Sequence, residues 1–444
     1  MHHADLVNCV RQVEPLTRYG KVNQLVGLVV EAAGPDDVAL GEGCWLGDRG
    51  GSAVPAEVIG FRRGRVLLMP LGEVEGIRPG TRVFPTRGLM RIPVGRTLRG
   101  RIIDGLGRPL DGAGPVSAES WRTVHRAAPE PLSRRRVCAA LGTGVRAIDG
   151  MVTCGRGQRL GIFAGSGIGK STLMGMIARN SEADVNVIGL VGERGKEVLD
   201  FIEASLGPQG LRRSVVVVAT ADQPALVRLK AAFVATTIAE YFRDLGQDVM
   251  LMMDSLTRVA MAQREIGLAA GEPPTTRGYT PSVFALLPRL LERVGSTSAG
   301  SVTGLYTVLV EGDDMDEPIA DAARAILDGH MVLSRRLATR GQYPPIDVMA
   351  SVSRVMRDVV SAAHYRQAQE IKSLLAAYEE AEDLINIGAY ARGSNARIDT
   401  AVRFIDRINA YLRQDVETSG PFMQHVQQLM ELLQDSPSER SPAA

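Results

Sequence analysis

The sequence predicts an α/β protein whose central part is a parallel β-sheet covered by helices on both faces. Between residues 137 and 360, short apolar runs of β-forming residues alternate with longer helix-like stretches, which is the pattern of such a sheet. Ahead of this part, residues 20–96 hold short β-rich runs separated by glycine-containing turns. After residue 360 the β-rich runs end and helical periodicity begins.

The composition is that of a globular protein with more than one domain. The chain has 444 residues, of which 45% are hydrophobic and 23% charged, which excludes a disordered or collagen-like chain. Its longest apolar runs, such as 249–253, stop far short of the roughly 20 residues of a membrane-spanning helix. The four cysteines form no C-x-x-C pair, so we expect a reducing, cytoplasmic setting without disulfides or a zinc site.

The N-terminal part divides into an arm and a β-rich domain. Residues 1–19 are expected to form a short helix or a loose arm, and residues 20–96 a small antiparallel barrel or sandwich. The expected strands of this domain lie at 24–31, 56–61, 65–69 and 82–85.

Residues 97–136 are expected to be a linker rich in glycine, proline and arginine. Eleven arginines between 87 and 136 make this region basic, although the whole chain has a net charge of only +1. Two interpretations stay open: a solvated linker surface, or a contact surface for an acidic partner or nucleic acid.

The central domain is expected to span 137–360 and the C-terminal helical domain 361–444. The expected central strands lie at 159–163, 185–191, 215–220, 249–253 and 303–310, and the expected C-terminal helices at 361–387, 398–412 and 421–433. Within the first of these helices, one face collects five apolar side chains, those of Ile371, Leu374, Leu375, Tyr378 and Ile385.

The most specific motif is the stretch 164–172, Ala-Gly-Ser-Gly-Ile-Gly-Lys-Ser-Thr, between a strand and a helix. This is the context of a Walker A phosphate-binding loop, whose main-chain N–H groups surround the β- and γ-phosphates of a nucleotide. Lys170 brings a charge to these phosphates and Ser171 a hydroxyl to Mg²⁺. The strict pattern has glycine at position 164, where Ala164 fits if its φ is negative. The expected nucleotide-binding residues are Gly165, Ser166, Gly167, Ile168, Gly169, Lys170, Ser171 and Thr172.

Nucleotide hydrolysis also needs an acid that places the metal and a group that orients water. Asp254 ends the apolar run 249–253, as a Walker B acid does, although an Asp there can also cap a helix. Glu193 follows the run 185–191 between glycines and is well placed to polarise a water; a surface turn with a Glu–Arg pair is the alternative. Nothing local marks Arg354 as special, and Tyr343 before two prolines can stack on adenine or pack a turn.

Eight ordered motifs together resemble the type III protein-export ATPases, which are similar to the catalytic subunits of rotary F1-type ATPases. The motifs begin at residues 142, 164, 192, 254, 271, 311, 326 and 351 and read GTGVRAID, AGSGIGKST, GERG, DSLTR, GEPPTTRGY, EGDD, ILDGH and SVSR. The phrases FAGSG from 163, GAYARGS from 388 and LMPLGEVEGI from 68 resemble the flagellar branch.

This resemblance implies a six-stranded N-terminal β-barrel, a RecA-like P-loop core with a parallel sheet and a C-terminal helical domain, assembled as a homohexamer. It implies that Mg²⁺-dependent ATP hydrolysis energises type III export of flagellar proteins. It assigns Glu193 as the residue that activates water, Arg354 as an arginine finger that reaches the neighbouring subunit's nucleotide, and Tyr343 as an aromatic of the adenine pocket. Lys170 and Asp254 complete the expected catalytic set, and Ser171 and Asp254 the expected Mg²⁺ ligands.

The implied partners follow from the same resemblance. They are a dimeric flagellar regulator that binds the N-terminal arm, a central stalk protein, export-gate membrane proteins, and export chaperones with their substrates. The implied location is the cytoplasmic face of the export apparatus, with peripheral membrane association and without nucleic acid.

Three alternative functions are compatible with parts of the sequence. A virulence injectisome ATPase has the same chemistry. A non-catalytic nucleotide-binding subunit carries Gln where this chain has Glu193. An RNA translocase is disfavoured by the net charge of +1 and by the lack of an aromatic and basic RNA-binding pattern in the barrel.

Overall fold

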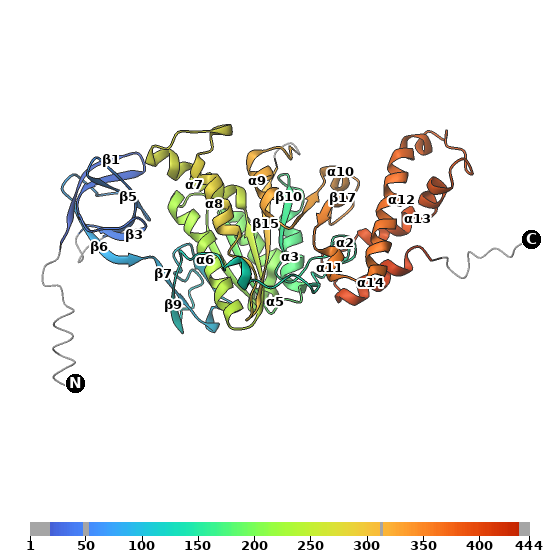
Figure 1. Cartoon of the computed structure of the whole chain (residues 1–444), viewed down its shortest axis with the longest axis horizontal. Helices are drawn as coiled ribbons and strands as arrows, with labels where there is room; N and C mark the ends of the chain where they lie inside the picture. The colour runs from blue at the N-terminus through green and yellow to red at the C-terminus, as the bar shows by residue number, and fades with distance from the viewer. Residues whose placement is uncertain (1–17, 48–52, 311–313, 435–444) are drawn as a thin grey trace, which may run out of the picture. The chain divides into compact units, whose positions relative to one another are not determined.

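The computed structural model describes residues 18–47, 53–310 and 314–434 (Figure 1). The expected arm at 1–19 lies outside the described residues except for its last two, as do the first three residues of the motif at 311. The chain forms two compact units, one that contains the barrel up to residue 91 with the short segments 224–226 and 265–273, and one that contains the rest.

The N-terminal unit is a closed six-stranded antiparallel barrel, as the sequence predicts. Its strands follow the order β1-β2-β5-β4-β3-β6 around the barrel. Side chains that alternate along these strands, among them Val30, Leu46 and Leu68, fill its interior. The strands are β1 Gly20–Val26, β2 Val29–Ala33, β3 Glu42–Leu46, β4 Val54–Arg62, β5 Arg65–Pro70 and β6 Arg82–Leu89.

Two details of the barrel differ from the sequence prediction. The run expected as one strand at 24–31 is a hairpin of β1 and β2, which turns at Gly27 with a φ of +57° that glycine adopts without strain. β3 was not predicted, because its short sequence, Glu-Gly-Cys-Trp-Leu, contains few β-branched residues.

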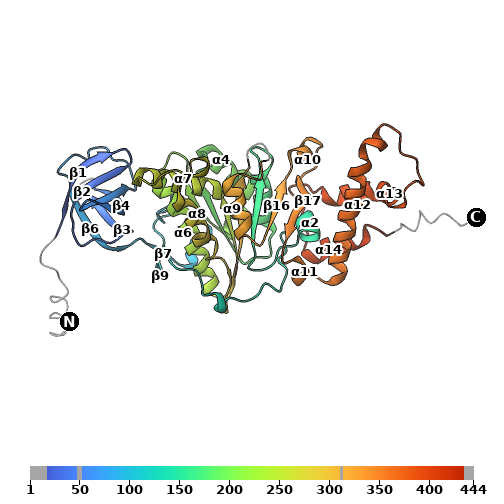
Figure 2. The same cartoon turned by 45° about the horizontal axis from the view of Figure 1, so that its top comes forward.

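The second unit is built on a twisted sheet in the order β17-β16-β10-β15-β13-β11-β12-β8 (Figures 1 and 2). All five expected strands are present, and they pair in parallel. Every residue of β11 and β12 is buried, so both faces of the sheet are covered. Its strands are β8 Ile102–Asp104, β10 Arg159–Ala164, β11 Val185–Val191, β12 Ser214–Ala219, β13 Asp248–Asp254, β15 Ser301–Leu309 and β16 Gly329–Leu333, with the antiparallel strands β14 Gly295–Ser296 and β17 Ile346–Ser353.

The helices of this part follow the strands in sequence, as in other sheets built from strand–helix units. Their bounds are α2 Arg146–Met151, α3 Lys170–Asn180, α4 Gly195–Asp200, α5 Gly207–Arg212, α6 Ala225–Asp244, α7 Leu256–Ala270, α8 Pro281–Leu291, α9 Pro318–Ile326, α10 Arg335–Thr339 and α11 Met356–Val359.

The arginine-rich stretch 97–136 contributes strands to the second unit. β8 pairs with the edge of the sheet beside β12, and β9 Ser120–Thr123 pairs with β7 Arg91–Val94. Several of its arginines form ion pairs inside the chain, as a solvated linker surface allows. These pairs are Arg101 with Asp111, Arg122 with Asp244, Arg126 with Glu240 and Arg134 with Glu292.

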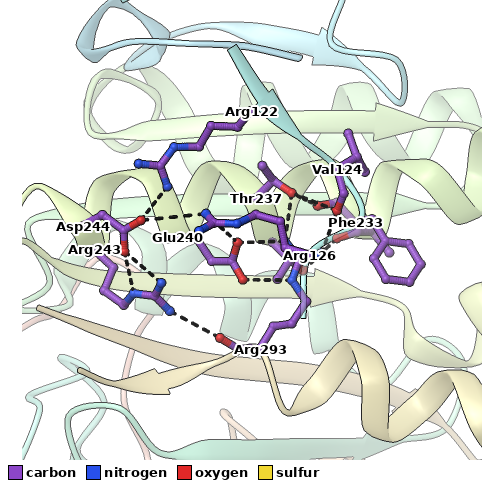
Figure 3. Close-up of polar contacts among 11 residues, drawn as sticks. Arg122, Val124, Arg126, Phe233, Thr237, Glu240, Arg243, Asp244 and Arg293 are labelled. Atoms are coloured by element: carbon purple, nitrogen blue, oxygen red, sulfur yellow. Dashed lines mark hydrogen bonds and ion pairs between the residues drawn. The ribbon is translucent and has the colours of Figure 1, made fainter. Parts of the chain in front are cut away.

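A buried polar network attaches this stretch to α6 (Figure 3). The guanidinium of Arg293 is fully buried and donates two hydrogen bonds of 2.8 Å to the carboxylate of Glu240. It also donates to the main-chain oxygen of Val124 and to the hydroxyl of Thr237. The network thus joins the segment after β9, helix α6 and the residues after α8.

The C-terminal part contains the three expected helices, α12 Ala362–Asn386, α13 Ala396–Leu412 and α14 Phe422–Glu431. Ser361 and Asn395 cap the first two by accepting main-chain N–H bonds. Of the expected apolar face of α12, Ile371 and Leu374 are buried, and the other three side chains are half-buried.

The C-terminal helices dock on α2, the helix that precedes β10. Nδ1 of His425 lies 2.8 Å from Oδ2 of Asp149, and both side chains are buried. Asp149 also accepts bonds from the main-chain N–H and the hydroxyl of Thr143. These bonds hold α2 against the C-terminal helices and against the segment that directly precedes it.

Candidate active site

The glycine loop joins the end of β10 to the start of α3, as expected. Gly167 and Gly169 have φ values of +76° and +98°, which L-residues with a side chain rarely adopt. Ala164 lies inside β10 and has no positive φ, so the alanine at this position introduces no strain. Gly169 directly precedes the helix, whose N-terminal N–H groups therefore face the loop.

Lys170 at the start of α3 meets Asp254 at the end of β13 and Glu193 just after β11 beside this loop. Nζ of Lys170 lies 2.5 Å from Oδ1 of Asp254 and 3.6 Å from Oε1 of Glu193. The hydroxyl of Thr307 on β15 donates to the same Oδ1 of Asp254 over 2.7 Å. The sheet order explains this meeting, because β10, β15, β13 and β11 are consecutive and their carboxyl ends lie at one edge.

Lys170, Asp254 and Glu193 line a cavity of about 340 Å³. Seven of the eight expected loop residues line it together with Glu193 and Asp254, and so do Arg258 and Glu197, which the sequence analysis did not single out. The cavity is polar at the loop and is bordered by apolar side chains such as Val198 and Phe201. The remaining loop residue, Ile168, points its side chain into the hydrophobic core.

The charges around this cavity change the proton affinities of its side chains. Burial raises the pKa of Glu193 to about 7, with the charge of Asp254 and a hydrogen bond to Glu197 adding to the effect and Lys170 opposing it. Burial alone would lower the pKa of Lys170, but the carboxylates of Asp254 and Glu193 outweigh it and raise that pKa above its usual value. Lys170 therefore stays an ammonium, while Glu193 titrates near neutral pH.

The donor set fits a magnesium ion. Asp254 and Ser171, the two expected ligands, both line the cavity and both present oxygen. Mg²⁺ prefers such oxygen ligands and uses one or two carboxylates together with phosphates and water. Among the described residues, no group of three or more His, Cys, Asp or Glu side chains is placed to hold a metal ion by itself.

Two expected site residues lie outside the cavity within this single chain. Arg354 follows the outer strand β17, and its exposed guanidinium donates to the main-chain oxygen of Arg324 over 3.3 Å. Tyr343 is 52% exposed in the loop before β17, and its main-chain oxygen accepts a bond from Gln414. Both residues therefore stay predictions.

Sequence reasoning missed several residues that the fold brings to the site. Arg258 lies in the first turn of α7, and a Cβ on Gly192 would lie 2.9 Å from its Cβ, so Gly192 leaves room for it. Thr307 lies on β15, whose residues show no motif of their own. Glu197 lies in the first turn of α4, and Glu193 lies in the loop before that helix, so no periodic pattern links the two residues in the sequence.

Comparisons with known proteins agree with this architecture. Residues 144–353 match the ATP synthase alpha/beta family, nucleotide-binding domain, residues 22–87 match the beta-barrel domain of the same family, and residues 360–431 match the T3SS EscN ATPase C-terminal domain. A flagellum-specific ATP synthase of Bacillus subtilis is 54% identical over 94% of this chain and 95% of its own length. A type 3 secretion system ATPase of Xanthomonas euvesicatoria is 51% identical over the same shares.

A solved structure shows the same fold. The assembled ATPase EscN of the enteropathogenic E. coli type III secretion system superposes with a TM-score of 0.89 at 44% identity, covering 94% of this chain and all of the EscN chain. EscN in complex with its central stalk EscO gives a TM-score of 0.87 at 43% identity, with the same coverage. Within the described residues, no helix is both long and apolar enough to cross a membrane.

Proposed function

The chain belongs to the family of flagellar and type III secretion ATPases, which are ATP hydrolases, and on this premise we propose that it hydrolyses ATP to drive export of flagellar proteins across the cytoplasmic membrane. The observation that carries this proposal is the meeting of Lys170, Asp254 and Glu193 at the end of the glycine loop. A nucleotide-holding subunit needs the first two groups, but an ATPase also needs a carboxylate that orients water.

In the proposed reaction, the main-chain N–H groups of the loop and the ammonium of Lys170 bind the β- and γ-phosphates. The carboxylate of Glu193 accepts a hydrogen bond from the attacking water and directs it in line at the γ-phosphorus. Lys170 then neutralises part of the charge that builds on the transferring oxygens. Because the pKa of Glu193 is raised to about 7, its protonated and ionised forms are both populated at neutral pH.

Mg²⁺ would be held by Asp254 and Ser171. Its bound charge neutralises the β- and γ-oxygens in reactions of this class. Asp254 is 4% exposed and already accepts bonds from Lys170 and Thr307, which fix the direction of its carboxylate.

We further propose that the active site is completed by a second copy of the chain in a homohexamer. The cavity lacks Arg354, whose exposed position after the outer strand suits a contact with a neighbouring subunit. In that arrangement Arg354 acts as an arginine finger and Tyr343 stacks on the adenine. The assembled state of EscN, 44% identical to this chain, supports the ring.

The ring has a direct test by subunit mixing. Lys170→Ala and Arg354→Ala should each be inactive alone, but a mixture contains interfaces with an intact Lys170 on one side and an intact Arg354 on the other. We expect the mixture to recover a measurable share of wild-type ATPase activity. A mixture as inactive as its components, while both variants still assemble, would reject the role of Arg354 in trans.

The proposed partners are a central stalk protein, a dimeric regulator that binds the N-terminal arm, export-gate membrane proteins, and chaperones with export substrates. The stalk is supported by the complex of EscN with EscO. With these partners, the proposed location is the cytoplasmic face of the export apparatus, peripheral to the membrane. Pull-down of the regulator with a chain lacking residues 1–18 should fail, and undiminished capture would remove the arm from this proposal.

The second candidate function is that of a virulence injectisome ATPase, because a relative of that kind is 51% identical over 94% of the chain. The two functions differ in a complementation assay. We expect the chain to restore swimming to a Bacillus subtilis strain without its flagellum-specific ATP synthase. Rescue of effector secretion in a strain without its type 3 secretion ATPase, but not of swimming, would favour the injectisome.

A further inference from the structure

Arg335, which nothing above assigns to the site, contacts the glycine loop from outside the cavity. It begins α10, and its Nη2 donates a hydrogen bond of 3.0 Å to the main-chain oxygen of Ser166. A Cβ placed on Gly165 would lie 3.3 Å from the same Nη2. Arg335 is not among the described residues that line the cavity with Lys170. Its contact is therefore with the backbone of the loop, and its side chain does not line the cavity.

The strand pairing sets this contact. Ala164 at the end of β10 pairs with Leu333 at the end of β16, in parallel. Ser166 and Arg335 each lie two residues beyond this pair, so the two chain segments leave the sheet side by side. Ser334 fixes the turn, because its side chain caps α10 and its N–H donates to the main-chain oxygen of Pro345 over 2.9 Å.

The consequence for the nucleotide follows from the geometry of a peptide bond. The Ser166–Gly167 bond is not among the cis peptides of the described chain, so its C=O and N–H point in opposite directions. When Arg335 holds the oxygen of Ser166, the N–H of Gly167 points away from Arg335, and Gly167 lines the cavity. This restraint matters because Gly167 has a φ of +76° and, without a Cβ, could adopt many other backbone conformations.

We propose that Arg335 is a positioning residue for ATP binding, which orients the Ser166–Gly167 peptide so that its N–H faces the β- and γ-phosphates. This inference rests on the proposed ATPase function. The contact is made to the loop and is the same in the ground state and in the transition state, so its loss raises KM and leaves kcat unchanged.

The test compares Arg335→Ala with Arg335→Lys and with the control Arg336→Ala. Arg336 is the next residue of the same helix, is equally charged, and pairs with Glu379 instead of the loop. Binding of fluorescent ATP, ADP and AMP analogues is titrated, and steady-state kinetics are measured on the full-length chain. AMP has no β-phosphate and so does not use the N–H of Gly167.

We expect Arg335→Ala to weaken ATP and ADP binding about 3- to 10-fold, the factor that one hydrogen bond provides, with kcat within twofold of wild type. AMP binding and Arg336→Ala should stay at wild-type values, and Arg335→Lys should recover part of the loss. Equal weakening of all three nucleotides, a fall in kcat at constant KM, or no change would each overturn the proposal. A wild-type chain that neither binds nor hydrolyses ATP would instead reject the proposed function itself.

Discussion

The ammonium of Lys170 donates to the carboxylate of Asp254 over 2.5 Å, although the two residues are 84 positions apart and follow strands that are not neighbours. Strand β15 lies between β10 and β13 and contributes Thr307, which donates to the same carboxylate oxygen. Lys170 therefore has two functions. In the proposed reaction it binds phosphate, and in the structure it compensates a carboxylate that is only 4% exposed.

Lys170→Ala should lower the stability of the chain as well as its activity. Removing one member of a buried ion pair costs about 3–5 kcal/mol when the other stays dry, and less here because the cavity admits water. We expect a lower melting temperature than that of the wild type, measured by calorimetry at pH 7. Lys196→Ala, at an exposed site on α4, is the control and should melt like the wild type. Equal melting temperatures for both variants would show that Asp254 does not depend on Lys170.

The raised pKa of Glu193 predicts a pH-dependent cost to folding. The folded chain holds this proton up to about pH 7, whereas an unfolded chain releases it near pH 4.5. The free energy of unfolding should therefore fall as the pH rises between these values, and Glu193→Gln should escape that fall. We expect the variant to match the wild type at pH 4.5 and to be more stable by about 1–3 kcal/mol at pH 8. A stability difference that does not change with pH would show an ordinary pKa.

Gly150→Ala should destabilise the docking of the C-terminal helices. Gly150 lies within α2, where alanine is intrinsically better by about 1 kcal/mol. A Cβ at this position would, however, lie only 2.1 Å from the hydroxyl oxygen of Tyr411 on α13. We expect a net loss of about 1–3 kcal/mol in denaturant unfolding, the usual range for overpacking. Gly195→Ala, at a helical glycine with open space around it, should be neutral, and a stabilising Gly150→Ala would contradict the close packing.

The stability of the chain should also depend on the buried ion pair of Arg293 and Glu240 (Figure 3). Arg293→Met leaves the carboxylate of Glu240 buried without its main partner. The guanidinium of Arg126 stays 3.5 Å away. We expect a loss of about 3–5 kcal/mol. Adding Glu240→Leu to this variant should recover most of the loss, measured by urea unfolding. A double variant as unstable as the single one would show that packing, and not charge, dominates.

The architecture was predictable because each part has its own periodicity. Buried parallel strands produce apolar runs, and the runs at 185–191 and 249–253 became β11 and the core of β13 almost residue for residue. The hairpin at Gly27 was missed because apolar residues continue through the turn, and β8 because three residues are too few to show a period.

The site was predictable where one short segment carries the chemistry. The glycine loop is contiguous, and Asp254 and Glu193 each follow an apolar strand. Thr307 and Arg335 reach the site because of the order and register of the strands, which cannot be predicted from a local sequence pattern. Their contacts depend on β15 and β16 lying on either side of β10.

The most direct test of the proposed mechanism is a single-turnover measurement with Glu193→Gln and excess enzyme over radiolabelled ATP. The variant keeps Lys170 and the loop, so it should bind ATP with an affinity close to that of the wild type. Its hydrolysis step should be slower by a factor of about 100 or more, the size of a general-base contribution. A variant that binds ATP and cleaves it at the wild-type rate would show that Glu193 does not orient the attacking water.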